Sequence, residues 1–168
     1  SVVSFLDITV TSLDLHGRGF NDLPQLIMRH TTNLVELNLS QNHLKYLPYD
    51  FSELHVLEVL VLDDNEFTQV PPCLTNMKSL KELYLNRNLL EDLPAEISDQ
   101  TTLKRIVLDS NALKELPDSI SQLTNLEVLA LPNNNIQCLP EDIGELVHLS
   151  ILDVQCNSLE TVPDSIGS

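Results

Sequence analysis

The feature of this sequence that most limits its possible folds is a repeat of 23 residues. A leucine recurs at this interval without a break, and so do the asparagine eight residues after it and the proline six residues further on. Each copy follows LxxLxLxxNxLxxLPxxIxxLxx, and six successive copies begin at Leu34, Leu57, Leu80, Leu103, Leu126 and Leu149. A period of this length indicates an array in which each unit buries its apolar side against its neighbours.

An incomplete copy precedes these six, near residue 10, and it has Arg18 in place of the asparagine. We therefore expect a single array over residues 1–168, with copies starting near residues 10, 34, 57, 80, 103, 126 and 149. The final DSIGS comes where an eighth strand would begin, and a solenoid end without a polar cap exposes its core. The expectation is that this array is a fragment of a longer protein.

The leucines of each LxxLxL segment alternate with other residues, as in a short strand with one buried face. Strands of successive copies should lie side by side as a parallel sheet, about 4.8 Å apart. The asparagine follows the strand, where the turning backbone would bury unpaired polar groups at a cost of about 1–3 kcal/mol each. We expect its amide to satisfy these groups, forming a structural ladder of Asn42, Asn65, Asn88, Asn111, Asn134 and Asn157.

The second half of each copy begins with Leu-Pro and continues with an apolar anchor on the convex side, in an extended or short helical segment. The expected fold is thus an α/β solenoid, a curved horseshoe with a concave parallel sheet of about seven strands. Gln100 replaces an apolar residue of the convex side and threonines follow it, as they do near Thr31–Leu34. We expect a local irregularity at both places.

The spacing and the LPxxI segment resemble the leucine-rich repeats of intracellular Ras-scaffold and LAP proteins (Scribble, Erbin) and of the plant Ras-group proteins. The resemblance covers residues 10–166. It implies a protein–protein interaction module or scaffold that binds through its concave sheet, with a small GTPase or a phosphatase subunit as a possible kind of partner. It transfers no contact residues, because those positions vary within the family.

Equivalent positions of stacked copies form columns across the concave face, where function is expected. One column holds four consecutive apolar residues, and two valines of a neighbouring column flank it: Val61, Tyr84, Val107 and Ala130, with Val59 and Val128. These side chains should point to solvent. A contiguous apolar patch usually marks an interface, and tyrosine is enriched among the residues that dominate binding. Strand propensity is the alternative explanation.

Charged residues surround this stripe, and all four basic residues of the concave face lie in two adjacent copies. Arg87 should pair with Asp64, and Arg105 with Glu82; such exposed pairs contribute only about 0.2–1 kcal/mol and can simply hold the strands in register. The candidate partner-binding residues are the stripe and its polar neighbours: Val59, Val61, Asp63, Asp64, Tyr84, Asn86, Arg87, Arg105, Val107, Asp109, Val128 and Ala130.

The net charge of −16 opposes binding to nucleic acid and favours a neutral or basic protein partner. No apolar run of about 18 residues is present, so no membrane insertion is expected. Three widely spaced cysteines make neither a disulfide framework nor a metal motif, which favours a reducing, cytoplasmic location. We expect Cys73 and Cys138 to pack on the convex side and Cys156 to be exposed.

No catalytic, phosphate-binding or calcium-binding motif is found, and the five histidines fall at unrelated positions of the copies. We therefore expect no enzymatic activity, metal or cofactor. The first hypothesis is a non-catalytic module that binds a protein on its concave face. The second is the substrate-recognition domain of a larger enzyme, such as a kinase, phosphatase or ubiquitin ligase, and the third is a structural spacer. The sequence indicates no oligomeric state.

Overall fold

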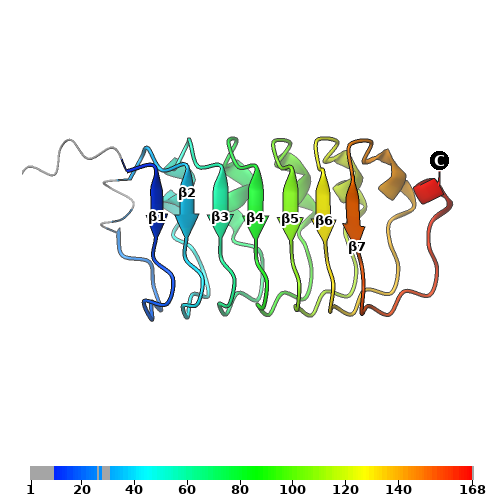
Figure 1. Ribbon diagram of the computed structural model, residues 1–168, viewed down its shortest axis with the longest axis horizontal. Helices are drawn as coiled ribbons and strands as arrows, with labels where there is room; N and C mark the ends of the chain where they lie inside the picture. Colours follow the sequence, from blue (N-terminus) through cyan, green and yellow to red (C-terminus); the bar gives the residue numbers. More distant parts are fainter. Residues whose placement is uncertain (1–9, 26, 28–30, 168) are drawn as a thin grey trace, which may run out of the picture.

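In the computed structural model, the copies form one parallel sheet of seven strands that follow each other in chain order (Figure 1). The structure describes residues 10–25, 27 and 31–167; the expected array also includes residues 1–9, which lie outside this part. The strands are β1 Ser12–Asp14, β2 Glu36–Asn38, β3 Val59–Val61, β4 Glu82–Tyr84, β5 Arg105–Val107, β6 Val128–Ala130 and β7 Ile151–Asp153. The α/β solenoid expected from the 23-residue period is confirmed.

Every strand pairs with the next in the same register. Leu37 pairs with Leu60, and Leu60 with Leu83, and this continues through all seven strands. The middle side chains of β2 to β6 are at most 1% exposed, so the two outer residues of each strand project from the opposite face. A slip of one residue would turn every buried leucine to solvent, and the leucine spacing therefore fixes the register.

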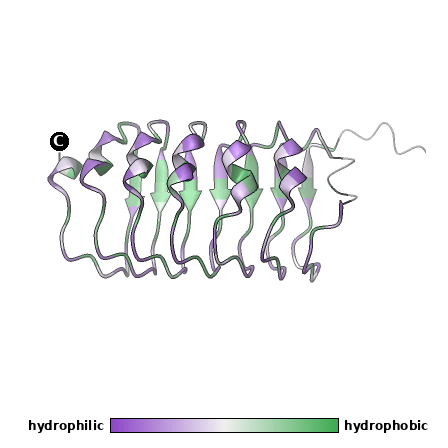
Figure 2. Cartoon of the chain, turned by 180° about the vertical axis from the view of Figure 1, so that it is seen from behind, coloured by the Kyte–Doolittle hydropathy of each residue, from purple (hydrophilic) through white to green (hydrophobic). Residues whose placement is uncertain are grey.

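The segments expected to be extended or helical are 3-10 helices, which cover one side of the sheet and lie in front of its mainly hydrophobic strands in Figure 2. They are η1 Tyr49–Glu53, η2 Pro72–Asn76, η3 Ala95–Asp99, η4 Asp118–Gln122, η5 Glu141–Glu145 and η6 Asp164–Gly167. A proline precedes each of η1 to η5 and accepts the first helical hydrogen bond, as from Phe51 N to Pro48 O at 3.0 Å. The core lies between helices and sheet. We call the other side of the sheet, the expected concave side, the open face.

Each repeated asparagine joins two copies. Asn65 Nδ2 donates to the carbonyl oxygens of Leu39 in the preceding copy (3.0 Å) and of Leu62 in its own copy (3.1 Å). Its Oδ1 accepts a hydrogen bond from the backbone N–H of Leu44 at 3.0 Å. The same pattern recurs at Asn88, and also at Asn111, Asn134 and Asn157. The amides therefore satisfy backbone groups that the turns would otherwise bury unpaired.

Gln100 does not disturb the backbone, so the irregularity found there is limited to its side chain. Its φ and ψ of −84° and 56° are close to the −75° and 66° of Leu54 at the same place in its copy. The difference lies in the side chain, which is 1% exposed with neither Oε1 nor Nε2 hydrogen-bonded among the described residues. Near Thr31 the turn is regular, since Leu34 N donates to Thr31 O at 3.0 Å, as Leu57 N does to Leu54 O at 3.1 Å. Before it, however, Gln25 and Ile27 are α-helical where the other copies have 3-10 helices.

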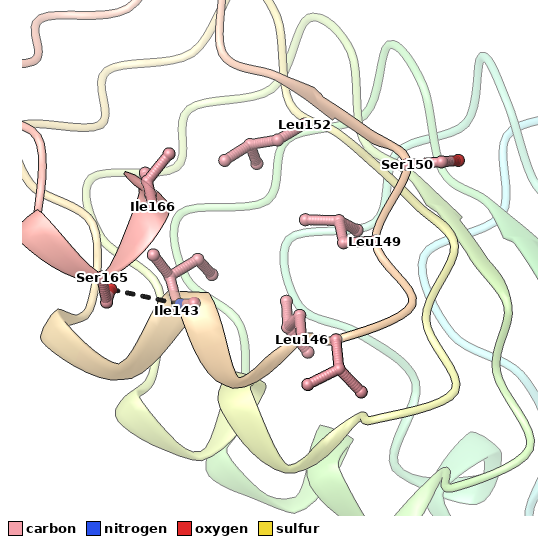
Figure 3. Close-up of a pocket in the computed structure, with 9 residues that line it drawn as sticks. Ile143, Leu146, Leu149, Ser150, Leu152, Ser165 and Ile166 are labelled. Carbon is pink, nitrogen blue, oxygen red and sulfur yellow. Dashed lines mark hydrogen bonds between the residues drawn. The ribbon is translucent and has the colours of Figure 1, made fainter. Parts of the chain in front are cut away.

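At the C-terminal end of the sheet, the core is less completely filled. A hollow of about 450 Å³ lies between η5, β7 and η6, and Leu146, Leu149, Leu152 and Ile166 surround it (Figure 3). Helix η6 is held against η5 by Ser165, whose Oγ accepts from the Gly144 N–H and donates to the Glu141 carbonyl. In the part of the chain that the structure describes, no helix has the length and apolar character needed to cross a bilayer.

Candidate functional site

The four apolar residues of the predicted stripe form a continuous row on the open face. Val61 pairs with Tyr84, Tyr84 with Val107, and Val107 with Ala130, each at the last position of its strand. All four are half-buried. The row ends at Asn38 on one side and at Asp153 on the other. We call these four residues the apolar row.

Tyr84 is held in place within the apolar row by its hydroxyl group. The hydroxyl donates to Glu82 Oε2 at 2.6 Å, and the same oxygen lies 3.8 Å from Arg105 Nε. Burial, followed by this hydrogen bond and the charge of Glu82, raises the pKa of Tyr84 to about 12. The hydroxyl is therefore protonated at physiological pH. Because the ring is already held in one orientation, it loses little conformational entropy when a partner binds.

Val128 does not project to solvent, and this part of the prediction is wrong. Its side chain is 6% exposed although it does not belong to the hydrophobic core cluster. Its register partners on the two adjacent strands are Arg105 and Ile151, which are longer. Val59 holds the same strand position between Glu36 and Glu82 and stays half-exposed, so strand position alone does not decide the burial of these valines.

A second row, at the carboxyl ends of the strands, consists of polar residues. Asp63 accepts hydrogen bonds from the backbone N–H and the Nδ2 of Asn86, at 2.8 and 3.1 Å. Asn86 Oδ1 accepts from the backbone N–H of Asp109 at 2.8 Å, and Asp109 Oδ1 accepts from Asn133 Nδ2 at 2.8 Å. Burial raises the pKa of Asp63 above its usual value, outweighing the hydrogen bonds from Asn86. We call Asp63, Asn86, Asp109 and Asn133 the polar row.

The residue before each ladder asparagine has a left-handed backbone, which sequence reasoning did not identify. Its φ is 54° at Asp64, 50° at Arg87 and 54° at Cys156, with similar values at Gln41, Ser110 and Asn133. A residue other than glycine is strained here by about 1–2 kcal/mol. Gly17 holds the equivalent position in the first copy, with a φ of 63°, and this glycine was the available signal.

The four basic residues of the open face all pair with carboxylates of neighbouring strands. Arg87 donates two hydrogen bonds to Asp64, from Nε to Oδ1 at 2.5 Å and from Nη2 to Oδ2 at 2.7 Å. These hydrogen bonds lower the pKa of Asp64. Lys81 contacts Glu58 and Lys104 contacts Glu127, both at 2.7 Å, and Arg105 approaches Glu82 as described above. The basic side chains of the copies that begin at residues 80 and 103 are thus paired within the chain.

A hollow of about 220 Å³ over β1 to β3 extends beyond the predicted site. It is lined by the three residues of β1, the three residues of β2, Val59 and Val61. Glu36 accepts from Ser12 Oγ at 3.3 Å, and Asp14 accepts from the backbone and the ring of His16, which lowers the pKa of Asp14. The signal in the sequence was the absence of basic residues from these columns in the first two strands.

The cysteines are in two environments. Cys73 is buried, and burial raises the pKa of its thiol to about 11, so it is unreactive near neutral pH. Cys156 is exposed, as expected. Cys138 is also exposed, and the prediction that it packs on the convex side is wrong, because its place in the copy is that of the exposed Tyr46 and Asp92. Among the described residues, no group of three histidine, cysteine or acidic side chains is placed to hold a metal ion.

The sequence is similar to known protein families and to a known protein. The sequence matches the family described as "Leucine rich repeat" over residues 8–67 and 101–159, and that described as "Leucine Rich repeats (2 copies)" over residues 55–97. It is 38% identical over 63 residues to CD180 antigen of Homo sapiens, a match that covers 38% of this chain and 10% of that protein.

Solved structures with similar folds come from bacteria and plants. The LRR protein LIC12759 of Leptospira interrogans is 32% identical, with a TM-score of 0.72 over 92% of this chain and 45% of its own. The Arabidopsis receptor kinase HAESA, solved with the peptide hormone IDA and the co-receptor SERK1, is 30% identical, with a TM-score of 0.76 over 88% of this chain and 26% of its own. This chain therefore spans less than half the length of each of these proteins.

Proposed function

This chain belongs to the leucine-rich repeat family, and we propose that it is a non-catalytic module that binds a protein partner on the open face of its sheet. The observation that carries this proposal is the apolar row, Val61, Tyr84, Val107 and Ala130, which runs unbroken across four strands. A contiguous apolar surface with a polar rim is typical of an interface. Strand propensity explains single valines, but it does not explain why four consecutive strands present their apolar residues at one position.

The side chains around the apolar row support a central contact at Tyr84. Its ring is fixed by Glu82, and the guanidinium of Arg87 is held by Asp64, so these groups have little freedom to lose when a partner binds. Tyrosine and arginine are also enriched among the residues whose truncation weakens protein interfaces most. The ligand class is supported by HAESA, which was solved with a peptide hormone.

A second candidate is a recognition domain of a larger enzyme. It is favoured by the likeness to HAESA, a receptor kinase, since this chain corresponds to 26% of the chain in that solved structure. Such a domain would use the same open face, and the partner would be the substrate or the activating ligand. For the scaffold alternative, the resemblance to Ras-scaffold proteins supports a small GTPase or a phosphatase subunit as partner. The free cysteines Cys73, Cys138 and Cys156 support a reducing, cytoplasmic location.

The proposal is tested by affinity capture with quantitative mass spectrometry, comparing the wild type with Val61→Glu and Tyr84→Ala. The matched control is Val56→Glu, which makes the same change at an exposed valine outside the apolar row. All proteins are first compared by thermal unfolding. Partners that are lost with Val61→Glu and Tyr84→Ala but kept with Val56→Glu support binding on the open face. A partner list that is the same for all variants overturns it.

A further inference from the structure

The open face of the sheet is divided by charge. Among the described residues, all four basic residues of this face lie in the copies that begin at residues 80 and 103, and each has a carboxylate within 4 Å. Over β1 and β2, by contrast, Asp14 and Glu36 have no lysine or arginine within that distance in the described ranges. The charge of Arg18 lowers the pKa of Asp14 from a longer distance, without an ion pair. In the described part of the chain, the first strands therefore present two carboxylates that contact no lysine or arginine, and His16 is the basic side chain in contact with Asp14.

The hollow over β1 to β3 has the size and walls for one side chain. Its volume of about 220 Å³ is below the roughly 300–1,000 Å³ that is usual for small-molecule sites. The acidic residues Asp14 and Glu36 line it together with the apolar Val59 and Val61. Lysine and arginine combine an apolar stem with a charged head, and they bury the stem while the head meets carboxylates. The walls and the charge complement such a side chain.

The hollow and the apolar row share Val61, so an occupant of one adjoins the other. From β2, at the middle of the hollow, to β5, which carries Val107, three strand spacings amount to about 14 Å. An extended chain that crosses the strands covers this distance with about four residues, since each residue advances by about 3.4 Å. A single short segment can therefore reach both features.

We propose that the partner presents an extended segment whose lysine or arginine side chain enters the hollow between Asp14 and Glu36, while an apolar residue about four positions away contacts the apolar row at Tyr84 and Val107. This inference rests on the proposed function and specifies the chemistry of the partner. The strongly negative net charge of the chain, −16, favours the approach of such a basic segment.

The probe for this proposal is a library of random 12-residue peptides displayed on phage and selected on the immobilised 168-residue chain. Selected peptides are synthesised, and their affinities are measured by fluorescence anisotropy for the wild type, Tyr84→Ala and the double variant Asp14→Asn/Glu36→Gln. The matched control is Glu141→Gln/Asp142→Asn on η5, which removes the same two charges from the other side of the sheet. Thermal unfolding first establishes that all variants are folded.

We expect peptides with a lysine or arginine about four residues from an aliphatic or aromatic residue. Their affinity should fall about five- to tenfold in Asp14→Asn/Glu36→Gln, fall in Tyr84→Ala, and stay unchanged in the η5 control. Selection on Glu36→Lys should yield acidic residues at the basic position.

Three results would overturn the inference. Peptides that need Tyr84 but carry no preferred basic residue would leave the proposed function standing and remove the hollow from it. An equal loss of affinity in the η5 control would mean that net charge alone attracts the peptides. Failure to select any peptide that needs Tyr84 excludes an extended segment, and the proposed function is then decided by the capture experiment alone.

Discussion

Tyr84 donates its hydroxyl hydrogen bond to Glu82, two residues earlier on the same strand and at a distance of 2.6 Å. Both side chains project from the open face, because they occupy the two outer positions of β4. The glutamate also faces Arg105 of the next strand. The aromatic ring at the centre of the candidate site is thus positioned by its own strand and by the adjacent one.

This arrangement predicts how stability depends on alkaline pH. The pKa of Tyr84 is about 12 in the folded chain and near 10 when unfolded, so its contribution is complete below pH 10 and is lost as the pH rises toward 12. Tyr84→Phe should remove this loss. Urea unfolding of both proteins at pH 9 and pH 11 measures it, with Tyr49→Phe, at an 84% exposed tyrosine, as the control. Equal pH dependence for Tyr84→Phe and the wild type would contradict the prediction.

Gln100→Leu should stabilise the protein by about 1–3 kcal/mol. The buried amide lacks hydrogen-bond partners among the described residues, and leucine is the residue found at this place in Leu54, Leu123 and Leu146. Denaturant unfolding gives the difference, and Gln122→Leu, at an exposed glutamine on η4, should leave stability within about 0.5 kcal/mol. A Gln100→Leu protein that is no more stable than the wild type would show that the amide is satisfied.

Asn88→Ala should destabilise the protein by about 3 kcal/mol or more. The change leaves the carbonyl oxygens of Leu62 and Leu85 and the N–H of Phe67 without the amide that bonds them. Asn76→Ala, at an exposed position at the end of η2, is the control for loss of an asparagine. The prediction fails where the midpoints of urea unfolding shift equally for the two variants.

Gln41→Gly should raise stability, by up to about 1 kcal/mol, because φ at this residue is 56°. Relief of the left-handed strain, about 1–2 kcal/mol, exceeds the entropy that glycine loses on folding, about 0.5–1 kcal/mol. Gln41→Val should have the opposite effect, since a β-branched residue tolerates this conformation least. Urea unfolding of the pair tests the order glycine, glutamine, valine, and any other order contradicts it.

Asp63→Asn should stabilise the protein at pH 7 and change little at pH 3. Burial raises the pKa of Asp63 in the folded chain, so its ionisation is unfavourable there, and stability is lost as the pH rises through the folded pKa. The amide oxygen can still accept from the Asn86 N–H, as Asn86 itself does from Asp109. Thermal melting at both pH values provides the measurement, and a loss of stability at pH 7 would show that both carboxylate oxygens are required.

The 23-residue period was sufficient to predict the register of the sheet and hence the neighbours of each open-face residue. Val61, Tyr84 and Val107 lie in one row because leucines at fixed intervals must all be buried. The burial of Val128 was not predictable in this way, since Val59 at the same strand position is half-exposed. The choice between extended and 3-10 segments was equally open, because Leu-Pro is compatible with both.

The hollow over β1 to β3 was missed for a related reason. Columns of residue types give the order of side chains across a sheet, but the space left between them depends on their conformations. Glu36 and Asn38 were placed correctly in their columns, and only the structure reveals that they border an unfilled volume with Val59. Gln100 is the third case, since its polarity was recognised but its complete burial was not.

Because the register is constant, the number of an open-face residue also gives the position of that residue across the sheet. Adding 23 to the number of an open-face residue in the six successive copies moves the position by one strand, about 4.8 Å, with the backbone unchanged. Exchanging Tyr84 and Val107 therefore moves the aromatic ring by one strand and keeps the composition of the chain constant. A series of such exchanges, each followed by a binding measurement, would show how many strands a bound partner contacts.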